Sequence, residues 1–247
     1  MSKKWNKLFF IIFQYYKYLR QMAIKAAINI ILNERLYIRD PEKTELGRKI
    51  LSASIELIED IGFESFTFKK LATKIDSTEA SIYRYFENKH KLLTYLVSWY
   101  WSWLEYQIAY QTHNISEPEQ RLKIALKVLA DDITYDPQFS HINEVLLHKI
   151  VVNESDKTYL TKEVDDANKE GFYRSYKSLC GVIAGIVKEV NPNFKYPHAI
   201  ISTAIEASHQ QKFFAQHLPS LTELDKGNSS EVSDFLNYFI FRVIREE

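Results

Sequence analysis

The sequence has little of what several protein classes require. Its 247 residues include one cysteine, Cys180, together with six glycines and six prolines. A lone cysteine excludes an internal disulfide framework and fits a reducing compartment, so we expect a cytoplasmic protein. The shortage of turn-forming residues argues against an all-β fold and favours helices.

Features that would support catalysis are also missing. No glycine-rich phosphate loop occurs, and Cys180 lies in an apolar helical stretch where a thiol is unreactive. His141 and His148 are seven residues apart, on one helical face, but no third metal ligand accompanies them. We therefore expect no enzyme activity, no metal site and no cofactor.

Neither sign of charge is in excess over the whole chain, but the charges are unevenly distributed. Residues 1–40 carry eight Lys and Arg against two acidic residues, whereas 94–247 carry 15 basic and 21 acidic ones. A long apolar run is absent as well: Lys17 and Arg20 interrupt the apolar residues at the N-terminus, and a bilayer takes ~20. Residues 1–43 are thus expected to be a basic extension, with a helix on the membrane surface as the weaker alternative and Met22 as an alternative start.

One short segment of this extension has the pattern of a hairpin. Ile28, Ile30 and Leu32 alternate with other residues up to Asn33, and Leu36 and Ile38 alternate after it. This period of two predicts two short strands that turn at Asn33 and Glu34.

Residues 44–93 have the pattern of three short helices followed by the start of a fourth. Apolar residues recur at helical spacing from Glu45 to Ile61, and Gly62 can end that helix with a positive φ. Thr67 can cap a second helix, and the polar pair Asp76-Ser77 separates it from a third at residues 78–86. Two short helices joined by a tight turn predict a helix-turn-helix.

In the third helix, Ile82 and Phe86 are four residues apart and can both face inward. This spacing places polar side chains on outward faces. The expected outward residues are Thr78, Glu79, Ser81, Arg84 and Tyr85.

The residues and spacing of this segment resemble the DNA-binding domain of TetR-family transcriptional regulators. The resemblance covers about 50 residues and rests on the following set: Ile50, Leu51, Ala53, Gly62, Phe63, Thr67, Leu71, Ala72, Ser81, Ile82, Tyr83, Tyr85, Phe86, Lys89, Leu92 and Leu93. The segment departs from the family in the turn, where Asp76-Ser77-Thr78 replaces the usual Gly-hydrophobic-Ser run. Asp tolerates a left-handed backbone, so we expect the turn to form.

The resemblance implies roles for individual side chains. Tyr83, Tyr85 and Lys89 occupy positions that hold the phosphate backbone in this family, and Thr67 and Lys69, which open the second helix, are further phosphate candidates. The candidates for base edges are Thr78, Glu79, Ala80, Ser81 and Arg84, of which Arg84 can pair with guanine and Ala80 can touch a thymine methyl. For Tyr83 and Glu79 the alternatives are packing and a solvated charge.

The rest of the chain, residues 91–247, has the pattern of further helices. They are expected at residues 89–112, from Pro118, at 139–152, at 156–190, from Pro197, and through Phe235 to Ile244. With the first three they give about nine helices, an all-α chain divided into the extension 1–43, a DNA-binding domain at 44–90, and a regulatory and dimerisation domain at 91–247.

Two binding surfaces are expected in the regulatory domain. An aromatic group can line an apolar ligand pocket, with ordinary core packing as the alternative: Trp99, Trp103, Tyr106 and Tyr110. Small and apolar residues of the last two helices can form a homodimer interface: Ala204, Ala207, Ser208, Phe235, Phe239, Ile240 and Val243.

Together these features predict a ligand-responsive, DNA-binding repressor of the TetR type, with double-stranded operator DNA, a second copy of the chain and a small apolar or amphipathic ligand as partners. Residues 44–93 hold eight basic and eight acidic side chains, so phosphate neutralisation gives modest non-specific affinity. The alternative is an interaction or membrane-surface adaptor that keeps this fold without binding DNA specifically.

Overall fold

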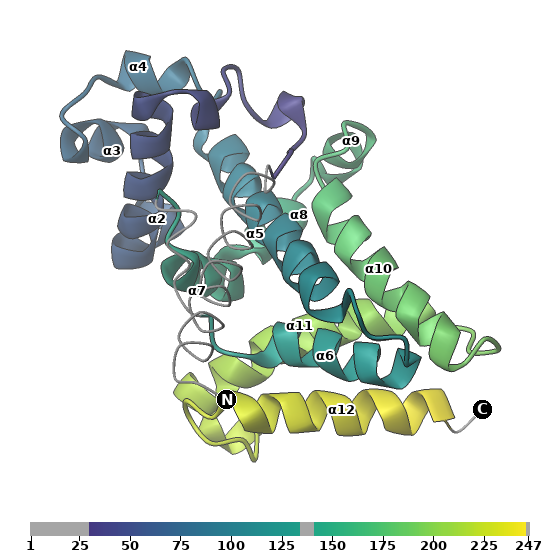
Figure 1. The fold of residues 1–247 in the computed structure, drawn as a ribbon. Helices are drawn as coiled ribbons and strands as arrows, with labels where there is room; N and C mark the ends of the chain where they lie inside the picture. Colours follow the sequence, from purple (N-terminus) through teal and green to yellow (C-terminus); the bar gives the residue numbers. More distant parts are fainter. Residues whose placement is uncertain (1–29, 134–140, 246–247) are drawn as a thin grey trace, which may run out of the picture. The chain divides into compact units, whose positions relative to one another are not determined.

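Every regular element of the described chain is helical. The computed structural model describes residues 30–133 and 141–245, and no strand occurs in them. The predicted all-α class is therefore confirmed. Residues 32–247 form one compact unit, whose helices are shown in Figure 1: α2 (Glu45–Ser65), α3 (Phe68–Lys74), α4 (Glu79–Tyr83), α5 (Lys89–Thr112), α6 (Pro118–Ala130), α7 (Glu144–Glu154), α8 (Asp156–Tyr159), α9 (Val164–Lys169), α10 (Arg174–Val190), α11 (Pro197–His217) and α12 (Ser229–Arg245).

Local signals in the sequence set the ends of the first helices. Gly62 has a φ of 73° and breaks the helical path of α2 as predicted, although one further turn follows it. The Thr67 side chain accepts a hydrogen bond from the backbone N–H of Lys70 at 3.2 Å, which confirms Thr67 as the cap of α3. The three helices pack on one another through fully buried apolar residues: Ile50, Leu51, Ile55, Phe66, Leu71, Ile82 and Phe86.

The turn between α3 and α4 has the backbone that Asp76 was expected to allow. Asp76 has a φ of 53°. Its N–H bonds the carbonyl of Thr73 at 3.3 Å, and the N–H of Ser77 bonds the carbonyl of Ala72 at 2.9 Å. These two bonds make a Schellman motif with Asp76 in the place usually taken by glycine.

The predicted hairpin is wrong over the described residues, although Ile28 lies outside them. Glu34–Leu36 and Pro41–Lys43 are 3₁₀ turns, labelled η1 and η2. The Asn33 side chain caps η1 by accepting from Arg35 N–H at 3.0 Å, and Leu36 is buried where η1 packs on α5. This local cap and the burial of one leucine outweigh the alternating pattern.

The longer helices surround α5. This helix packs against α10, α6 and α7, and α12 packs on α6 and α11 (Figure 1). The predicted bounds of α5 are confirmed, and Pro118 and Pro197 are the first residues of α6 and α11 as predicted. No helix in the described part of the chain is both long and apolar enough to span a bilayer.

Two predicted helices have different bounds. The single helix expected at residues 156–190 is three, α8, α9 and α10. Leu160, whose φ of −81° and ψ of 56° are not helical, ends α8, and Gly171 (φ 79°) ends α9 in a second Schellman motif. The helix expected from residue 139 begins at Glu144 instead, where the Asn143 side chain accepts from Leu146 N–H at 3.1 Å. Residues 134–140, which include the expected start, lie outside the described residues, as does the predicted surface helix near the N-terminus.

Candidate DNA-binding interface and sensor cavity

The recognition helix α4 is short and firmly capped. Thr78 Oγ1 accepts from Ser81 N–H at 3.2 Å and shares a hydrogen bond with Ser81 Oγ at 2.9 Å. Ile82 and Phe86 are fully buried, as their spacing predicted. The α-helix ends at Tyr83 and not at Phe86, since Arg84 is its C-cap.

The opposite side of α4 presents polar groups to solvent. Thr78, Ala80 and Arg84 are exposed, and Glu79 and Ser81 are partly exposed. These residues are the five predicted to face base edges. Their side chains share the accessible surface of one helix whose other side is anchored in the core, which is the arrangement a major-groove reader needs.

Tyr83 is suited to a phosphate contact and also packs. Its side chain is 48% exposed, and its ring lies edge-on to Phe68 with centroids 5.0 Å apart. Thr67 and Lys69, at the start of α3, are both exposed. These three of the five predicted phosphate candidates therefore reach solvent on the α3 and α4 elements.

Tyr85 does not face outward as expected. It is only 2% exposed, and its hydroxyl shares a hydrogen bond with Thr44 Oγ1 at 2.8 Å. The cause lies beyond the helix: the N-terminal segment before α2 covers this ring, and the Ile38 N–H bonds the Tyr85 carbonyl at 2.8 Å. Arg39 lies over the ring, 5.6 Å from its centroid, and places a cation at this edge that the sequence did not single out.

Lys89 was expected to hold a phosphate, but its ammonium group is already engaged. Nζ donates to the carbonyl oxygens of Phe63, Glu64 and Phe66 at 3.0, 3.2 and 3.3 Å. These are carbonyls at the end of α2, where the helix dipole favours a cation. A lysine has three donors, so Lys89 is a capping residue here and not a free phosphate ligand.

The aromatic residues predicted to line a ligand pocket are not among the residues that line the cavity described below. Trp99 and Trp103 are buried core residues, and Tyr106 stacks on Tyr110, which is 50% exposed. The alternative of core packing therefore describes the two tryptophans. Trp101, on the opposite face of α5, stacks on Tyr176 and His209.

A cavity of about 540 Å³ lies elsewhere, between α2, α7, α11 and the start of α12. We call it the sensor cavity. Such a volume is within the range of small-molecule sites. Its apolar wall comes from all four helices: Ile58, Val145, Ile150, Val152, Phe213 and Val232.

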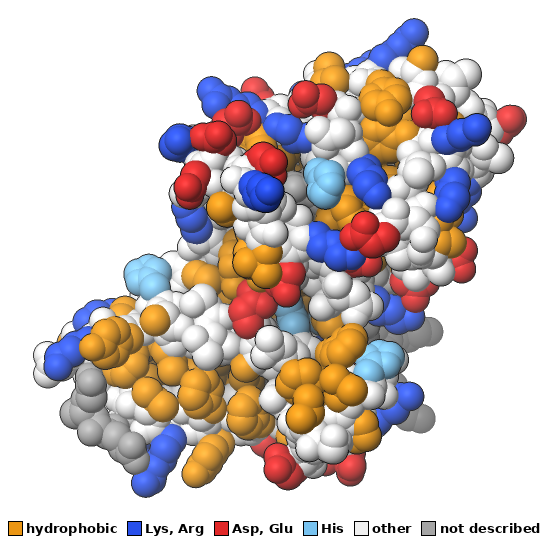
Figure 2. All heavy atoms as spheres, turned by 180° about the vertical axis from the view of Figure 1, so that it is seen from behind, with side chains coloured by type: hydrophobic (Ala, Val, Ile, Leu, Met, Phe, Trp, Pro, Cys, Tyr) orange, Lys and Arg blue, Asp and Glu red, His pale blue; other side chains and the backbone are white. Residues whose placement is uncertain are grey.

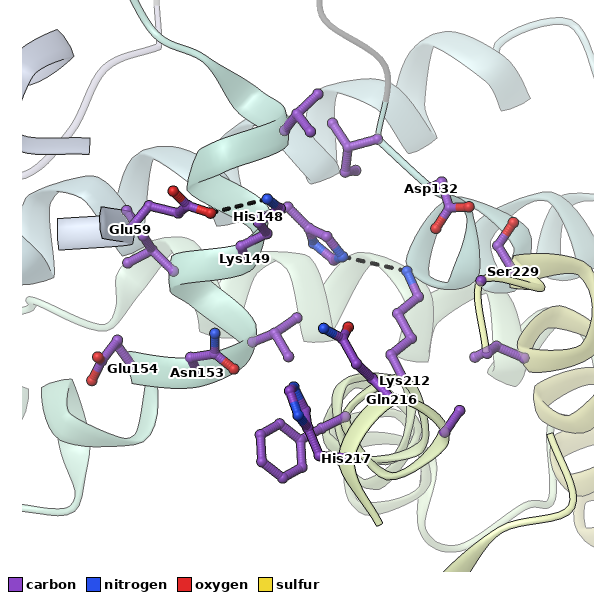
Figure 3. A pocket seen from close by; sticks show the side chains of 18 of the residues that line it. Glu59, Asp132, His148, Lys149, Asn153, Glu154, Lys212, Gln216, His217 and Ser229 are labelled. Atoms are coloured by element: carbon purple, nitrogen blue, oxygen red, sulfur yellow. Dashed lines mark hydrogen bonds and ion pairs between the residues drawn. The ribbon is translucent and has the colours of Figure 1, made fainter. Parts of the chain in front are cut away.

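A chain of polar groups reaches into this cavity. Figure 3 shows His148 on α7 and Lys212 on α11 pointing toward each other, with Lys212 Nζ 3.4 Å from His148 Nε2. His148 Nδ1 lies 2.6 Å from the Tyr100 hydroxyl, and Lys212 Nζ donates to the Asp131 carbonyl at 3.1 Å. A charged lysine only donates, so His148 Nε2 accepts and its Nδ1 carries the proton.

Burial controls the protonation of these groups. Burial, with the charge of Lys212 adding, holds the pKa of His148 well below its usual value and lowers the pKa of His209 to about 3. Burial also lowers the pKa of Lys212, although Asp132 and Asp131 oppose this shift. Both histidines are therefore neutral at pH 7.

The sequence analysis did not identify Lys212 as a cavity residue, although its spacing along α11 indicates that it faces inward. Lys212 follows the buried residues Ser208 and His209 by four and three positions, so helical spacing places it on the inward face of α11.

His141, expected on the same face as His148, instead lies 2.6 Å from Glu42. Among the described residues no cluster suited to a metal ion occurs.

The predicted dimer residues divide into two groups. Ala204, Ser208 and Ile240 are buried within the chain, and Ser208 donates to the Leu129 carbonyl at 2.8 Å, so these three do not face a partner. The remaining four lie partly or fully at the surface, with Phe235 and Phe239 stacked on each other: Ala207, Phe235, Phe239 and Val243.

Further apolar side chains extend this surface. Phe213 and Leu218 are 37% and 45% exposed, and Tyr238 is 72% exposed. Hydrophobic atoms gather over the lower part of the face seen in Figure 2, where α11 and α12 lie. We call these α11 and α12 residues the apolar face.

Comparison with known proteins agrees with this architecture. Residues 50–96 match the family model described as bacterial regulatory proteins, tetR family. None of the curated proteins matches the sequence. Solved structures share the fold at low identity, so they bear on architecture alone.

Three of these structures are informative. AibR in complex with isovaleryl coenzyme A and operator DNA is 16% identical, with a TM-score of 0.54 over 78% of this chain and 98% of that chain. The superantigen PfiT is 15% identical, with a TM-score of 0.54 over 85% and 100% of the two chains. The TetR family transcriptional regulator PfmR from Thermus thermophilus is 14% identical, with a TM-score of 0.51 over 78% and 97%.

The family match lies on the helix-turn-helix. The match to the family model begins within α2 and ends within α5, and so includes the whole of α3 and α4. Residues 50–96 therefore match the tetR family of bacterial regulatory proteins, and the chain as a whole shares the fold of the solved structures named above.

Proposed function

We propose that this protein is a cytoplasmic, sequence-specific DNA-binding regulator that acts as a homodimer and responds to a small ligand, most simply as a repressor. The observation that carries the proposal is the polar outer face of α4, held in place by the buried Ile82 and Phe86 and the Thr78 cap. A capped helix with free polar side chains on one side reads base edges in the major groove. No catalytic role is proposed.

A second copy of the chain fits this role. One reader domain contacts a single half-site, and specific operators of such proteins join two half-sites about one DNA turn apart. The apolar face supports a two-fold contact, since most of its members are aromatic and lie at the surface. The AibR structure, a complex with both isovaleryl coenzyme A and operator DNA, supports a regulator that couples a ligand to DNA.

The test is selection of duplex DNA from a random pool by the full-length protein. We expect an enriched two-half-site sequence, and Arg84→Ala should lower affinity for it by ~1–3 kcal/mol while relaxing preference at one base position in each half. Arg174→Ala is the matched control, because this exposed arginine begins α10 and should leave affinity unchanged. Equal losses from both variants would remove Arg84 from the base-reading set.

The rival function is an adaptor that keeps the fold without specific DNA binding. The equal numbers of acidic and basic residues in 44–93 favour it, as does the similar fold of the superantigen PfiT. The selection experiment separates the two, since an adaptor enriches no sequence over the starting pool.

A further inference from the structure

Lys212 differs from the other cations around the sensor cavity. Lys149, on α7, pairs with Glu59 Oε1 at 2.9 Å, so its charge is balanced. Lys212 Nζ has the Asp131 carbonyl and His148 Nε2 as partners, and both are neutral. No carboxylate of a described residue lies within ion-pair distance of it, although Asp132 and Asp131 act on its charge from farther away, so one N–H remains available at the cavity.

The acidic groups nearby are engaged or exposed. Glu59 is paired as above, and Glu154 accepts a hydrogen bond from the Phe63 N–H at 3.1 Å and forms an ion pair with Lys157 at 2.7 Å. Asp131 pairs with Lys127 on its own helix end. Asp132 and Asp225 line the cavity but are exposed, so water screens them.

Other polar groups can complete a headgroup site. Gln216 lies one turn after Lys212 on α11, and Ser229, at the start of α12, faces the same space (Figure 3). Both supply neutral donors. Lys212 is the one lysine of the described cavity lining without an ion-pair partner, so the site favours a ligand that carries a single negative charge over one that carries several.

We propose that the sensor cavity binds an amphipathic monoanion, with its anionic headgroup on Lys212 and its apolar part against the wall formed by α2, α7, α11 and α12. Binding itself does not depend on the function proposed above; only its consequence at DNA does. An ammonium group held beside an apolar wall recognises a carboxylate on an alkyl chain by charge and by burial together.

The position of the cavity gives the ligand direct access to the reader domain. Ile58, Glu59 and Gly62 belong to α2, and they form one side of the cavity. Glu59 is also tied to Lys149 of α7 across the same space (Figure 3). A ligand between α2 and α11 therefore touches a helix of the reader domain directly. Only the expected change in operator affinity rests on the proposed function.

The experiment measures binding to the full-length chain by calorimetry, using three ten-carbon probes that differ in headgroup: decanoate, decanol and decylamine. We expect decanoate to bind at least tenfold more tightly than decanol, and decylamine to bind more weakly than either. Lys212→Met and Lys212→Gln should both reduce the preference for decanoate over decanol to less than twofold while leaving decanol binding unchanged.

Lys149→Met is the matched control, because it removes a cavity lysine whose charge is already balanced, and it should preserve the preference for decanoate. Equal affinity for decanoate and decanol in the wild-type chain, tighter binding of decylamine, no binding of decanoate, or equal losses in the Lys149 and Lys212 variants would each overturn the proposal. A gel shift with selected DNA then reports coupling separately: decanoate that binds through Lys212 yet leaves operator affinity unchanged overturns only the coupling.

Discussion

At the scale of single residues, the neighbours of an ammonium group decide its role. Lys89 and Lys212 are both lysines on long helices, α5 and α11. Three helix-end carbonyls surround Lys89, so its charge stabilises the reader domain. Lys212 has one carbonyl and one imidazole, so its charge is available to a ligand. Residue type alone does not distinguish the two.

A buried histidine makes stability depend on pH. His209 is 6% exposed, is stacked on Trp101, and has a pKa lowered to about 3 by burial and by Lys212. An unfolded chain binds this proton near pH 6.5, so the unfolded state holds more protons between pH 6.5 and 3, and stability falls as the pH falls through this window.

We expect the free energy of unfolding to drop by about 2 kcal/mol from His209 alone between pH 7 and pH 5. Urea unfolding at the two pH values measures the total drop, to which His148 also contributes, and His209→Phe, which keeps a ring against Trp101, should remove the share that belongs to His209. The exposed His113 supplies the control, since His113→Phe should leave the pH dependence as in the wild type. A slope that His209→Phe does not change would contradict the assigned pKa.

At the scale of elements, the helix-turn-helix keeps its turn without glycine. Asp76 adopts a φ of 53°, where a side chain is strained by roughly 1–2 kcal/mol, less for Asp than for most residues. The two hydrogen bonds of the Schellman motif hold it there. The departure from the family's usual residue thus costs stability without changing the backbone path.

Asp76→Gly should therefore raise the free energy of unfolding by about 0.5–1 kcal/mol, because glycine adopts a positive φ without strain. The same substitution at Asp60, an exposed position inside α2, should lower it by a few tenths of a kcal/mol, because glycine is a poorer helix former. Chemical denaturation of both variants checks this contrast in sign. A loss of stability in Asp76→Gly would show that the carboxylate itself stabilises the turn.

Element boundaries followed local signals where such signals were strong. Thr67, Pro118 and Pro197 each marked a helix start that the structure has at the same place, whereas Gly62 breaks α2 and one further turn follows it. Residues 156–190 were expected to be one helix because their apolar spacing continues past Gly171. The positive φ of Gly171 and the burial of Phe172 after it divide α9 from α10. The sequence does not show which conformation a glycine inside a helical pattern adopts.

At the scale of the whole molecule, the apolar face predicts association. A cluster of exposed aromatic and aliphatic residues on two adjacent helices is costly to leave in water. We expect a homodimer at micromolar concentration, and Tyr238→Asp, which places a charge at a 72% exposed position on α12, should shift it to monomer. Light scattering measures the change in mass.

Tyr110→Asp is the control for this prediction, since Tyr110 is 50% exposed on α5 and lies outside the apolar face. It should leave the dimer intact. A wild-type chain that is monomeric at micromolar concentration would contradict the dimer, and the two-half-site operator expected above would then need another explanation.

The sequence by itself determined the all-α class, the helix-turn-helix with its resemblance to the TetR family, and the cap of α3. These features depend on residues a few positions apart, whose hydrogen bonds and spacing are local. Only the tertiary structure decided which side chains remain available. Tyr85 is covered by the segment before α2, Lys89 is held by carbonyls more than twenty residues earlier, and the sensor cavity combines α2, α7, α11 and α12. Contacts between residues so far apart in the chain leave no periodic signal, because they depend on how whole helices pack.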